Sequence, residues 1–223
     1  MTAQWLVVAA LRAELPRGLD AHDEFRTHAL GHVGVRSGGM LLPGSGDALI
    51  ITGTCGALRP GVKLGTLVMP QRLIRPGLRS LEPNARLRAA LLSGAASEGV
   101  RVVPDPLVEV NALIDAPSER ARAAGEHHAS FVDMESASLA LEAEERGIPW
   151  AVLRIVSDSE EQPLAFLTDL FGSVPTEQPG LASVARALAR RPWHLPRLVA
   201  LGWALHVGRG AVGRTLVAAR ASA

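Results

Sequence analysis

The sequence predicts a single-domain α/β fold, a three-layer sandwich in which helices flank a mixed, mostly parallel β-sheet. Short apolar runs typical of buried strands alternate with longer segments of helical periodicity. The 223 residues suit one large domain, and 48% of them are hydrophobic against 20% charged, as in a globular protein. The sequence shows no internal repeat and no linker long enough to separate two domains.

Five apolar runs are predicted to be strands: Trp5–Leu11, Ala48–Thr52, Thr66–Met69, Phe131–Met134 and Pro149–Val156. The first has no basic residue before it and is interrupted by Arg12, which favours a strand over a signal peptide. No window approaches the roughly 18 to 20 apolar residues of a membrane-spanning helix. Cys55 is the only cysteine, which fits a reducing compartment, so we expect a cytoplasmic protein.

Five segments are predicted to be helices: Asn84–Ser97, Pro117–Gly125, Glu135–Gly147, Leu181–Arg191 and Leu195–His206. Asp115 and Ser118 are candidate caps of the second. We expect a main α/β unit over residues 1–180 and a basic helical C-terminal extension over residues 181–223, packed on that unit or on a membrane surface.

Polar residues follow four of the predicted strands. They are Glu14, a glycine turn at residues 53–56, Glu135 and the pair Ser157-Asp158. Because ligands bind outside the carboxyl ends of strands in such sheets, we expect these residues to meet at one face.

Four segments, in this order, resemble motifs of the nucleoside phosphorylase/nucleosidase superfamily: residues 8–14 (VAALRAE), 53–68 (GTCGALRPGVKLGTLV), 132–137 (VDMESA) and 154–158 (RIVSD). The resemblance implies cleavage of a purine nucleoside's N-glycosidic bond. Asp158 would protonate the departing base at N7 and Ser157 would orient Asp158. To hold its proton, Asp158 would need partly apolar surroundings.

The same resemblance implies roles on the sugar side. Glu135 would hold the ribose hydroxyls, Met134 would pack beneath the sugar, and Glu14 would bind and activate water. The nucleophile would be positioned by Thr54 and the turn that includes Gly53 and Gly56. Each assignment has a plainer alternative: a helix cap for Ser157-Asp158, a solvated acid for Glu14 or Glu135, a core residue for Met134, and a tight turn for the glycines.

The C-terminal part of the sequence indicates one branch of this superfamily. Residues 190–196 (RRPWHLP) and the following helix are similar to the tail of the hopanoid-associated phosphorylases, which implies release of adenine from adenosylhopane, a nucleoside linked to a lipid. Methylthioadenosine/S-adenosylhomocysteine nucleosidase and purine nucleoside phosphorylase are the alternatives. A non-catalytic nucleoside- or lipid-binding protein is an alternative of another class. We also expect a homodimer.

Phosphorolysis would need inorganic phosphate as co-substrate and a cationic clamp, for which Arg12, Arg36 and Arg75 are candidates. Glu14 beside the nucleophile would repel phosphate, so the sequence favours hydrolysis. The short, glycine-rich segment 32–47 predicts a shortened or missing helix on the nucleophile side. No metal-site spacing and no cofactor motif occur in the sequence, so we expect no metal and no cofactor.

Seven arginines and no acidic residue follow Glu177. Together with tryptophans and leucines they suit peripheral contact with the inner face of a membrane. The alternative is a helix packed on the sheet or on a dimer partner. Too few aromatic residues accompany the charge for a single-stranded nucleic-acid platform, so we expect no specific nucleic-acid partner. The stretch 164–171 (LAFLTDLF) either lines a pocket for the 5′ group or packs in the core.

Overall fold

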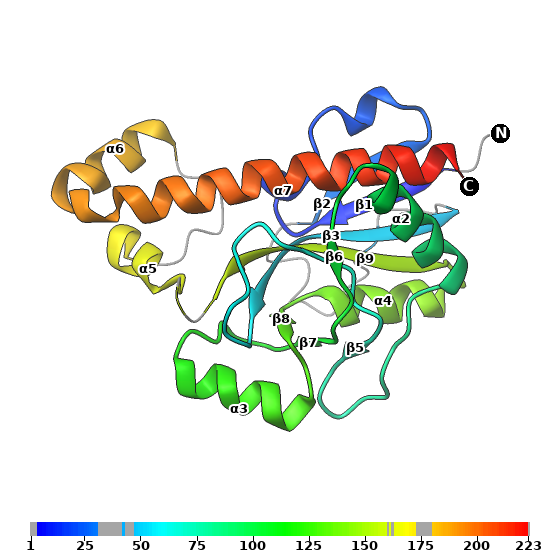
Figure 1. Cartoon of the computed structure of the whole chain (residues 1–223), viewed down its shortest axis with the longest axis horizontal. Coiled ribbons are helices and arrows are strands. Elements are labelled where there is room, and N and C mark those ends of the chain that lie inside the picture. The colour runs from blue at the N-terminus through cyan, green and yellow to red at the C-terminus, as the bar shows by residue number, and fades with distance from the viewer. Residues whose placement is uncertain are drawn as a thin grey trace.

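The computed structural model describes residues 4–30, 42, 47–159, 161, 163–172 and 180–222. Its strands are β1 (Trp5–Ala9), β2 (Phe25–Ala29), β3 (Ala48–Ala57), β4 (Leu67–Val68), β5 (Leu73–Ile74), β6 (Val102–Val103), β7 (Leu107–Glu109), β8 (Phe131–Asp133) and β9 (Trp150–Asp158). Its helices are α2 (Ala85–Ser97), α3 (Pro117–His127), α4 (Ser136–Glu145), α5 (Ala165–Phe171), α6 (Leu181–Arg190) and α7 (Leu195–Ala221), with the 3-10 turns η1 (Arg12–Glu14), η2 (Leu19–Ala21) and η3 (Pro192–His194) (Figure 1).

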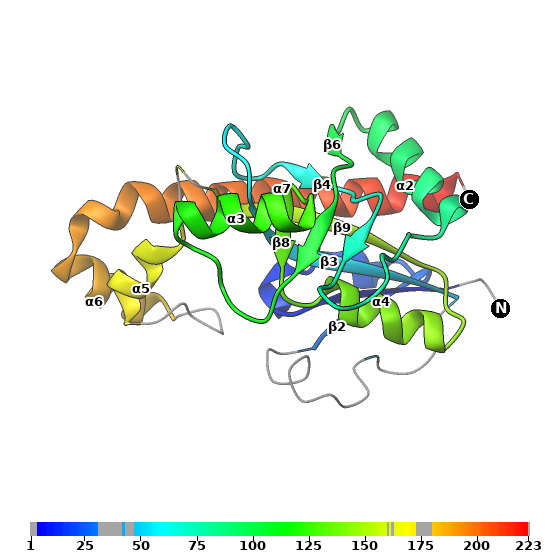
Figure 2. The ribbon, with the colours of Figure 1, turned by 90° about the horizontal axis from the view of Figure 1, so that it is seen from below.

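Three parallel strands, β1, β3 and β9, form the middle of a mixed sheet. Their side chains alternate between two apolar clusters. Ile50 and Leu153 pack with residues of α2 and α7, whereas Ile51 and Val152 pack with residues of α4. Figure 2 shows α7 and α4 on opposite sides of the sheet. Helices on both faces explain why these strands are apolar throughout, and the predicted fold class is confirmed.

The long strand β3 extends to the end of the sheet where the polar residues lie, and pairs there with two other strands. It pairs in parallel with β9 along most of its length, and its tip pairs with the antiparallel strand β8. A register shift between Cys55 and Gly56 places Gly56 beside Asp158. Because β8 runs back along β3, the residues that follow β8 return toward Thr54. Glu135 therefore reaches this region from the carboxyl end of β8, a strand that is antiparallel to β3 and parallel to β7.

Helix α7 is longer than predicted and its second half belongs to the main core. Val212 and Leu216 are fully buried in the cluster that contains Ile50. The helix crosses α2 so closely that a Cβ on Gly94 would lie 2.5 Å from the carbonyl oxygen of Thr215. The division of the chain at residue 180 stays a prediction, but α7 is packed on the sheet through much of its length.

Two local predictions were wrong. Residues 53–56 are not a turn after a strand, because pairing with β9 and β8 extends β3 to Ala57. Neither Asp115 nor Ser118 caps α3. The N-cap is Ala116, no side chain caps the helix, and Pro117 stands in its first turn, where its missing N–H costs nothing.

Candidate active site

A cavity of about 180 Å³ lies among the ends of β1, β3, β8 and β9. Seven of the eight predicted site residues line it: Glu14, Thr54, Gly56, Met134, Glu135, Ser157 and Asp158. Apolar side chains that include Leu113 and Leu164 complete its wall. Four segments far apart in sequence therefore meet at one cavity.

Glu14 stands at the β1 side of the cavity and is held by three hydrogen bonds. Its Oε1 accepts from the Thr54 backbone N–H at 3.1 Å and from the Thr54 hydroxyl at 2.6 Å. Its Oε2 accepts from the Leu11 N–H at 3.0 Å. These bonds fix the carboxylate against β3, in an orientation that a base acting on a bound water would need.

Gly53, the eighth predicted residue, does not line the cavity, but two side chains lie close to its backbone. Its φ of +129° lies in a region that side chains rarely adopt, and a Cβ there would lie 2.4 Å from Nη1 of Arg154 and 3.1 Å from Oε2 of Glu14. Glycine at this position lets β3 pass between an arginine and a carboxylate.

Asp158 is 3% exposed, and both of its carboxylate oxygens are engaged. The Ser157 hydroxyl donates to Oδ1 at 2.9 Å, which matches the predicted orienting contact. Arg120 of α3 forms a buried ion pair with Oδ2 and also donates to the carbonyl oxygen of Ala57 at 2.7 Å. We expected partly apolar surroundings for Asp158, but a buried guanidinium lies directly against its carboxyl group.

A second buried arginine, Arg154, lies beside two acidic residues of the cavity wall. Its Nη2 lies 2.6 Å from Oδ2 of Asp133 and 3.6 Å from Oε2 of Glu135. Its Nε and Nη2 also donate to the Ser136 hydroxyl, at 3.0 and 2.9 Å. Burial raises the pKa of Glu135 to about 7, with Arg154 opposing the rise and Asp133 adding to it. Near neutral pH, Glu135 can therefore either donate or accept a hydrogen bond.

Our sequence reasoning assigned no role to Arg120, Arg154 or Asp133. Arg154 did carry a signal, since an arginine inside the apolar run 149–156 must find a buried partner. Arg120 carried none, because it stands among several charged residues of α3. Cys55 also lines the cavity, and burial raises the pKa of its thiol, which suits an unreactive residue.

Other predicted positions lie away from the cavity. Arg75 pairs with Glu109 at 3.5 Å and donates to the Ser138 hydroxyl at 2.9 Å. Arg12 is exposed, and the described residues lining the cavity include no lysine or arginine. Arg36, like most of the segment 32–47, lies outside the described residues. In the stretch 164–171, Leu164 lines the cavity, whereas Phe166 and Leu167 are buried against Leu201.

Two features are absent from the part of the chain that the structure describes. No three histidine, cysteine, aspartate or glutamate side chains are grouped so as to hold a metal ion there. Likewise, no helix among those residues combines the length and the apolar character that crossing a bilayer demands.

Solved structures with a similar fold include a futalosine hydrolase and nucleosidases. A futalosine hydrolase mutant of Helicobacter pylori shares 17% identity and a TM-score of 0.63 over 85% of this chain and 100% of its own. The 5′-methylthioadenosine/S-adenosylhomocysteine nucleosidase of the same organism, with butyl-thio-DADMe-Immucillin-A, shares 14% identity and a TM-score of 0.68 over 100% of both chains. The corresponding nucleosidase of Colwellia psychrerythraea 34H, in complex with adenine, shares 15% identity and a TM-score of 0.62 over 94% and 97% of the two chains.

No match was found among curated proteins. The family model described as "Phosphorylase superfamily" matches residues 40–176, which include β3, β8, β9 and most of the cavity wall. This match covers more than half of the chain and confirms the superfamily that the four motifs predicted. The protein belongs to the phosphorylase superfamily.

Proposed function

We propose that the protein is an N-glycosidase that hydrolyses an adenine nucleoside. The observation that carries the proposal is the shared cavity of Glu14 and Asp158. Glu14 is hydrogen-bonded to Thr54. Asp158 lies opposite Gly56, which is two residues further along β3 than Thr54. Two residues of an extended strand span about 7 Å, so the two carboxyl groups can contact different parts of one small ligand.

In the proposed reaction, water attacks C1′ as the C1′–N9 bond breaks. Glu14 accepts a proton from the water, and Asp158 gives one to the departing base. Glu135 holds the ribose hydroxyls while positive charge builds on the sugar. Solvent returns one proton to Asp158 and takes one from Glu14, so the overall reaction consumes only water.

The contacts of Asp158 add one requirement. Ser157 and Arg120 each donate a hydrogen bond to one of its oxygens, so the proton for the purine must lie on a lone pair that these two contacts leave open. The cavity must also open further, because about 180 Å³ is below the roughly 300–1,000 Å³ usual for small-molecule sites.

Hydrolysis is favoured over phosphorolysis by the charge of the cavity. Its described lining carries the carboxyl groups of Glu14, Asp133, Glu135 and Asp158 and no cationic side chain. Among the described residues, a phosphate dianion would find no arginine clamp of the kind that usually binds it. Inorganic phosphate would therefore be a co-substrate only if the protein had the second candidate function, that of a nucleoside phosphorylase.

For the substrate we propose adenosylhopane first and methylthioadenosine or S-adenosylhomocysteine second. The resemblance of the tail to hopanoid-associated proteins supports the first. The structural neighbours, one with a butyl-thio inhibitor and one with adenine, support the second. Leu113 and Leu164 in the cavity wall suit the apolar 5′ group of adenosylhopane or of methylthioadenosine. A homodimer stays part of the proposal, and light scattering would test it.

The decisive test is release of free adenine from a panel of adenine nucleosides in phosphate-free buffer. Asp158→Asn should lower the rate at least ~10²-fold, the scale of general acid catalysis. Asp105→Asn is the matched control, since Asp105 accepts from Ser130 away from the cavity. A strict need for phosphate would replace hydrolysis by phosphorolysis. Nucleoside binding without turnover, unchanged in Asp158→Asn, would point to a non-catalytic binder.

A further inference from the structure

Exposed apolar side chains are concentrated on α6, η3 and the first half of α7. Six of the eight large apolar side chains that are exposed among the described residues lie there: Leu181, Trp193, Leu195, Val199, Trp203 and Val207. Trp193 is 64% exposed and Trp203 is 69% exposed. Contiguous exposed apolar surface of this kind marks an interaction site. We call residues 181–207 the tail surface.

The four members on α7 form a stripe. Leu195, Val199, Trp203 and Val207 follow one another at four-residue spacing, which puts them on one side of the helix. The other side is used by the fold, since Leu201, Ala204 and Gly208 are buried. The first half of α7 therefore has two apolar sides. One packs in the protein and the other is exposed to water.

Helix α6 has even less support from the fold. None of its ten residues is buried. Leu181, Val184 and Leu188 share one side of it, at the i, i+3, i+7 spacing of an apolar helix face. Helices this short are marginal in water without tertiary packing. Val184 and Leu188 are half-buried, whereas Leu181 is 89% exposed, so a partner that covers the open part of this face would stabilise the helix.

The charge of the tail surface indicates the kind of partner. Four arginines stand among the apolar residues: Arg186, Arg190, Arg191 and Arg197. From Leu181 to the end of the sequence there is no acidic residue. The nearby acid Asp169 on α5 is paired with Arg191 at 3.3 Å and with Nε2 of His194 at 2.6 Å.

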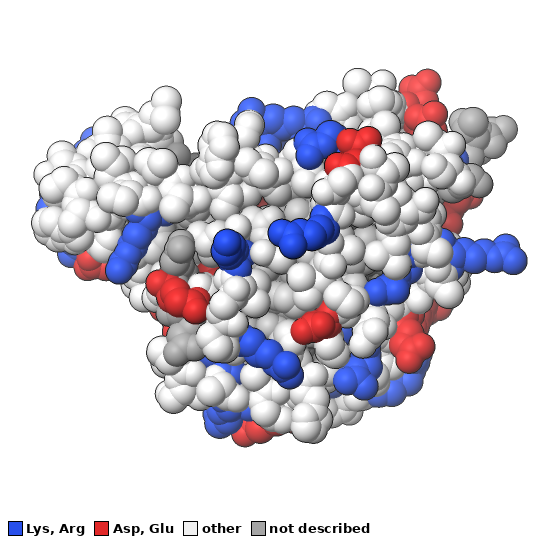
Figure 3. Space-filling model, viewed as in Figure 1, with Lys and Arg blue, Asp and Glu red and all other residues white. Residues whose placement is uncertain are grey.

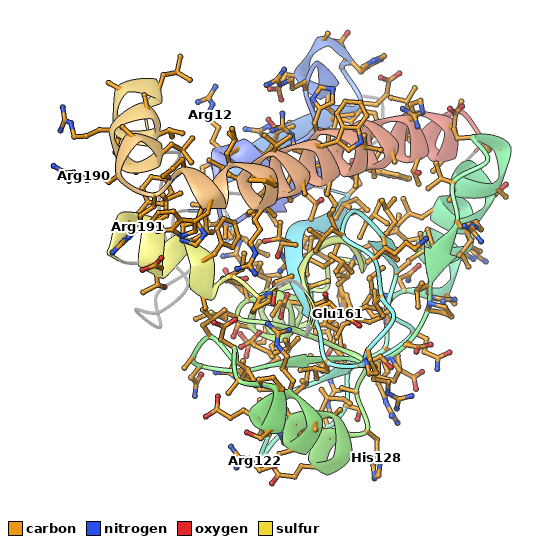
Figure 4. The ribbon with its side chains drawn as sticks, turned by 60° about the vertical axis from the view of Figure 1, so that its left-hand side comes forward. Arg12, Arg122, His128, Glu161, Arg190 and Arg191 are labelled. Atoms are coloured by element: carbon orange, nitrogen blue, oxygen red, sulfur yellow. The ribbon has the colours of Figure 1, made fainter. Side chains whose placement is uncertain are left out.

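The figures show how these charges lie. In Figure 3 the surface over α6 and the start of α7 is white, with basic side chains at its margin. Figure 4 shows Arg190 and Arg191 at the end formed by α5 and α6, far from Arg122 on α3.

We propose that the tail surface docks on the face of an anionic lipid membrane. Arginines bind anionic headgroups, while tryptophan and leucine enter the boundary between headgroups and acyl chains. A second copy of the chain is a poorer partner, because it would bring two sets of arginines together. The absence of a spanning helix among the described residues fits a surface contact.

The tail surface adjoins the cavity, and this part of the inference rests on the proposed function. Leu164 lines the cavity and also packs beside Phe166, Leu167 and Leu201, the cluster that joins α5 to α7. Apolar groups thus run from the cavity wall to the docking helix. A nucleoside whose 5′ group is anchored in a lipid layer could place its base in the cavity while its apolar part stays near the membrane.

Binding to vesicles tests the docking directly. The full-length wild-type protein is mixed with phosphatidylglycerol or phosphatidylcholine vesicles that contain no nucleoside, and bound protein is sedimented. We expect binding to phosphatidylglycerol that weakens with salt. Brominated lipid should quench Trp193 and Trp203 but not Trp5 and Trp150, which are 5% and 2% exposed.

Variants separate the apolar from the charged contribution. Trp193→Ser with Trp203→Ser should weaken binding by at least about tenfold, and Arg186→Gln or Arg190→Gln by about fivefold each. Leu78→Ser and Arg122→Gln are matched controls on other exposed surfaces and should change nothing. A chain ending at residue 180 is unsuitable, because it would lose the core residues Val212 and Leu216.

The outcomes distinguish this inference from the proposed function. Equal binding to both lipids, unquenched tryptophans or unaffected variants would overturn the docking, whatever the enzyme activity. A dimer in which Trp193 and Trp203 become buried would assign the tail surface to a second copy. Vesicle binding by a protein that releases no adenine would leave the docking intact and remove the proposed function.

Discussion

Arg120 joins the carbonyl oxygen of Ala57 to the carboxylate of Asp158, so α3 is tied to the tips of both β3 and β9. The Arg120 and Asp158 side chains are 1% and 5% exposed. Such a pair is costly to break from one side, because the remaining charge stays buried. Losing one partner of the contact that shapes the candidate site should therefore destabilise the fold.

A double-mutant cycle tests this coupling. Arg120→Met should lower the free energy of unfolding by about 3–5 kcal/mol, because Asp158 loses its partner. Adding Asp158→Asn should cost less than the sum of the single changes, by about 0.5–3 kcal/mol. Urea denaturation provides the measurement. Arg122→Met, on the exposed side of the same helix, should stay within about 0.5 kcal/mol of the wild type. Strictly additive effects would mean that the pair contributes nothing.

The pKa of Glu135 predicts a pH dependence of stability. Burial raises this pKa from 4.5 to about 7, so the folded protein binds the Glu135 proton more tightly than the unfolded chain does. The resulting stability is fully present below about pH 4.5 and is lost as the pH rises through about 7.

Glu135→Gln isolates this effect, because glutamine resembles the protonated side chain. Between pH 5 and pH 8 (a roughly three-unit range around the shifted pKa), the wild type should lose stability relative to this variant. Thermal unfolding across the range measures the difference. Glu126→Gln, on an exposed part of α3, should follow the wild-type curve. Parallel curves for the wild type and Glu135→Gln would contradict the shifted pKa.

The sequence predicted the strands of the sheet centre because burial on both faces demands continuous apolar runs. This rule could not predict the shorter strands. β5 and β6 have two residues each, and so few residues carry no readable period. Residues 53–56 were misassigned because glycines usually end strands, whereas here they admit Glu14, Arg154 and Asp158 to the backbone of β3.

The candidate site was predictable where a motif stood at the end of a strand. Glu14 and Asp158 both follow from this rule. Arg120 did not, because its partner is 38 residues away and belongs to another element. An ion pair of this kind depends on how α3 is placed over the sheet, which no local pattern of α3 encodes.

Gly53→Ala should harm both stability and activity. The new methyl group would meet Arg154 at 2.4 Å, and the φ of +129° would strain any side chain. We expect a loss of about 1–3 kcal/mol of stability from the strained backbone. Gly61→Ala is the control, since it also has a positive φ, +79°, but open space around its Cβ. If both variants keep full activity, the close approach at Gly53 has no role in the site.

The bond between the Thr54 hydroxyl and Glu14 predicts a kinetic effect without a loss of fold. Thr54→Val removes a 2.6 Å hydrogen bond from Oε1 of Glu14 and leaves only the backbone N–H on that oxygen. A hydrogen bond to a charged group contributes about 1.5–3 kcal/mol, so kcat should fall roughly 10- to 100-fold. Thr52→Val, two residues earlier on β3, is the matched control, because its buried hydroxyl has no partner among the described residues. A methyl group there should be neutral or stabilising. Adenine release at saturating nucleoside measures both variants, and equal kcat values would mean that Thr54 does not position Glu14 for the reaction.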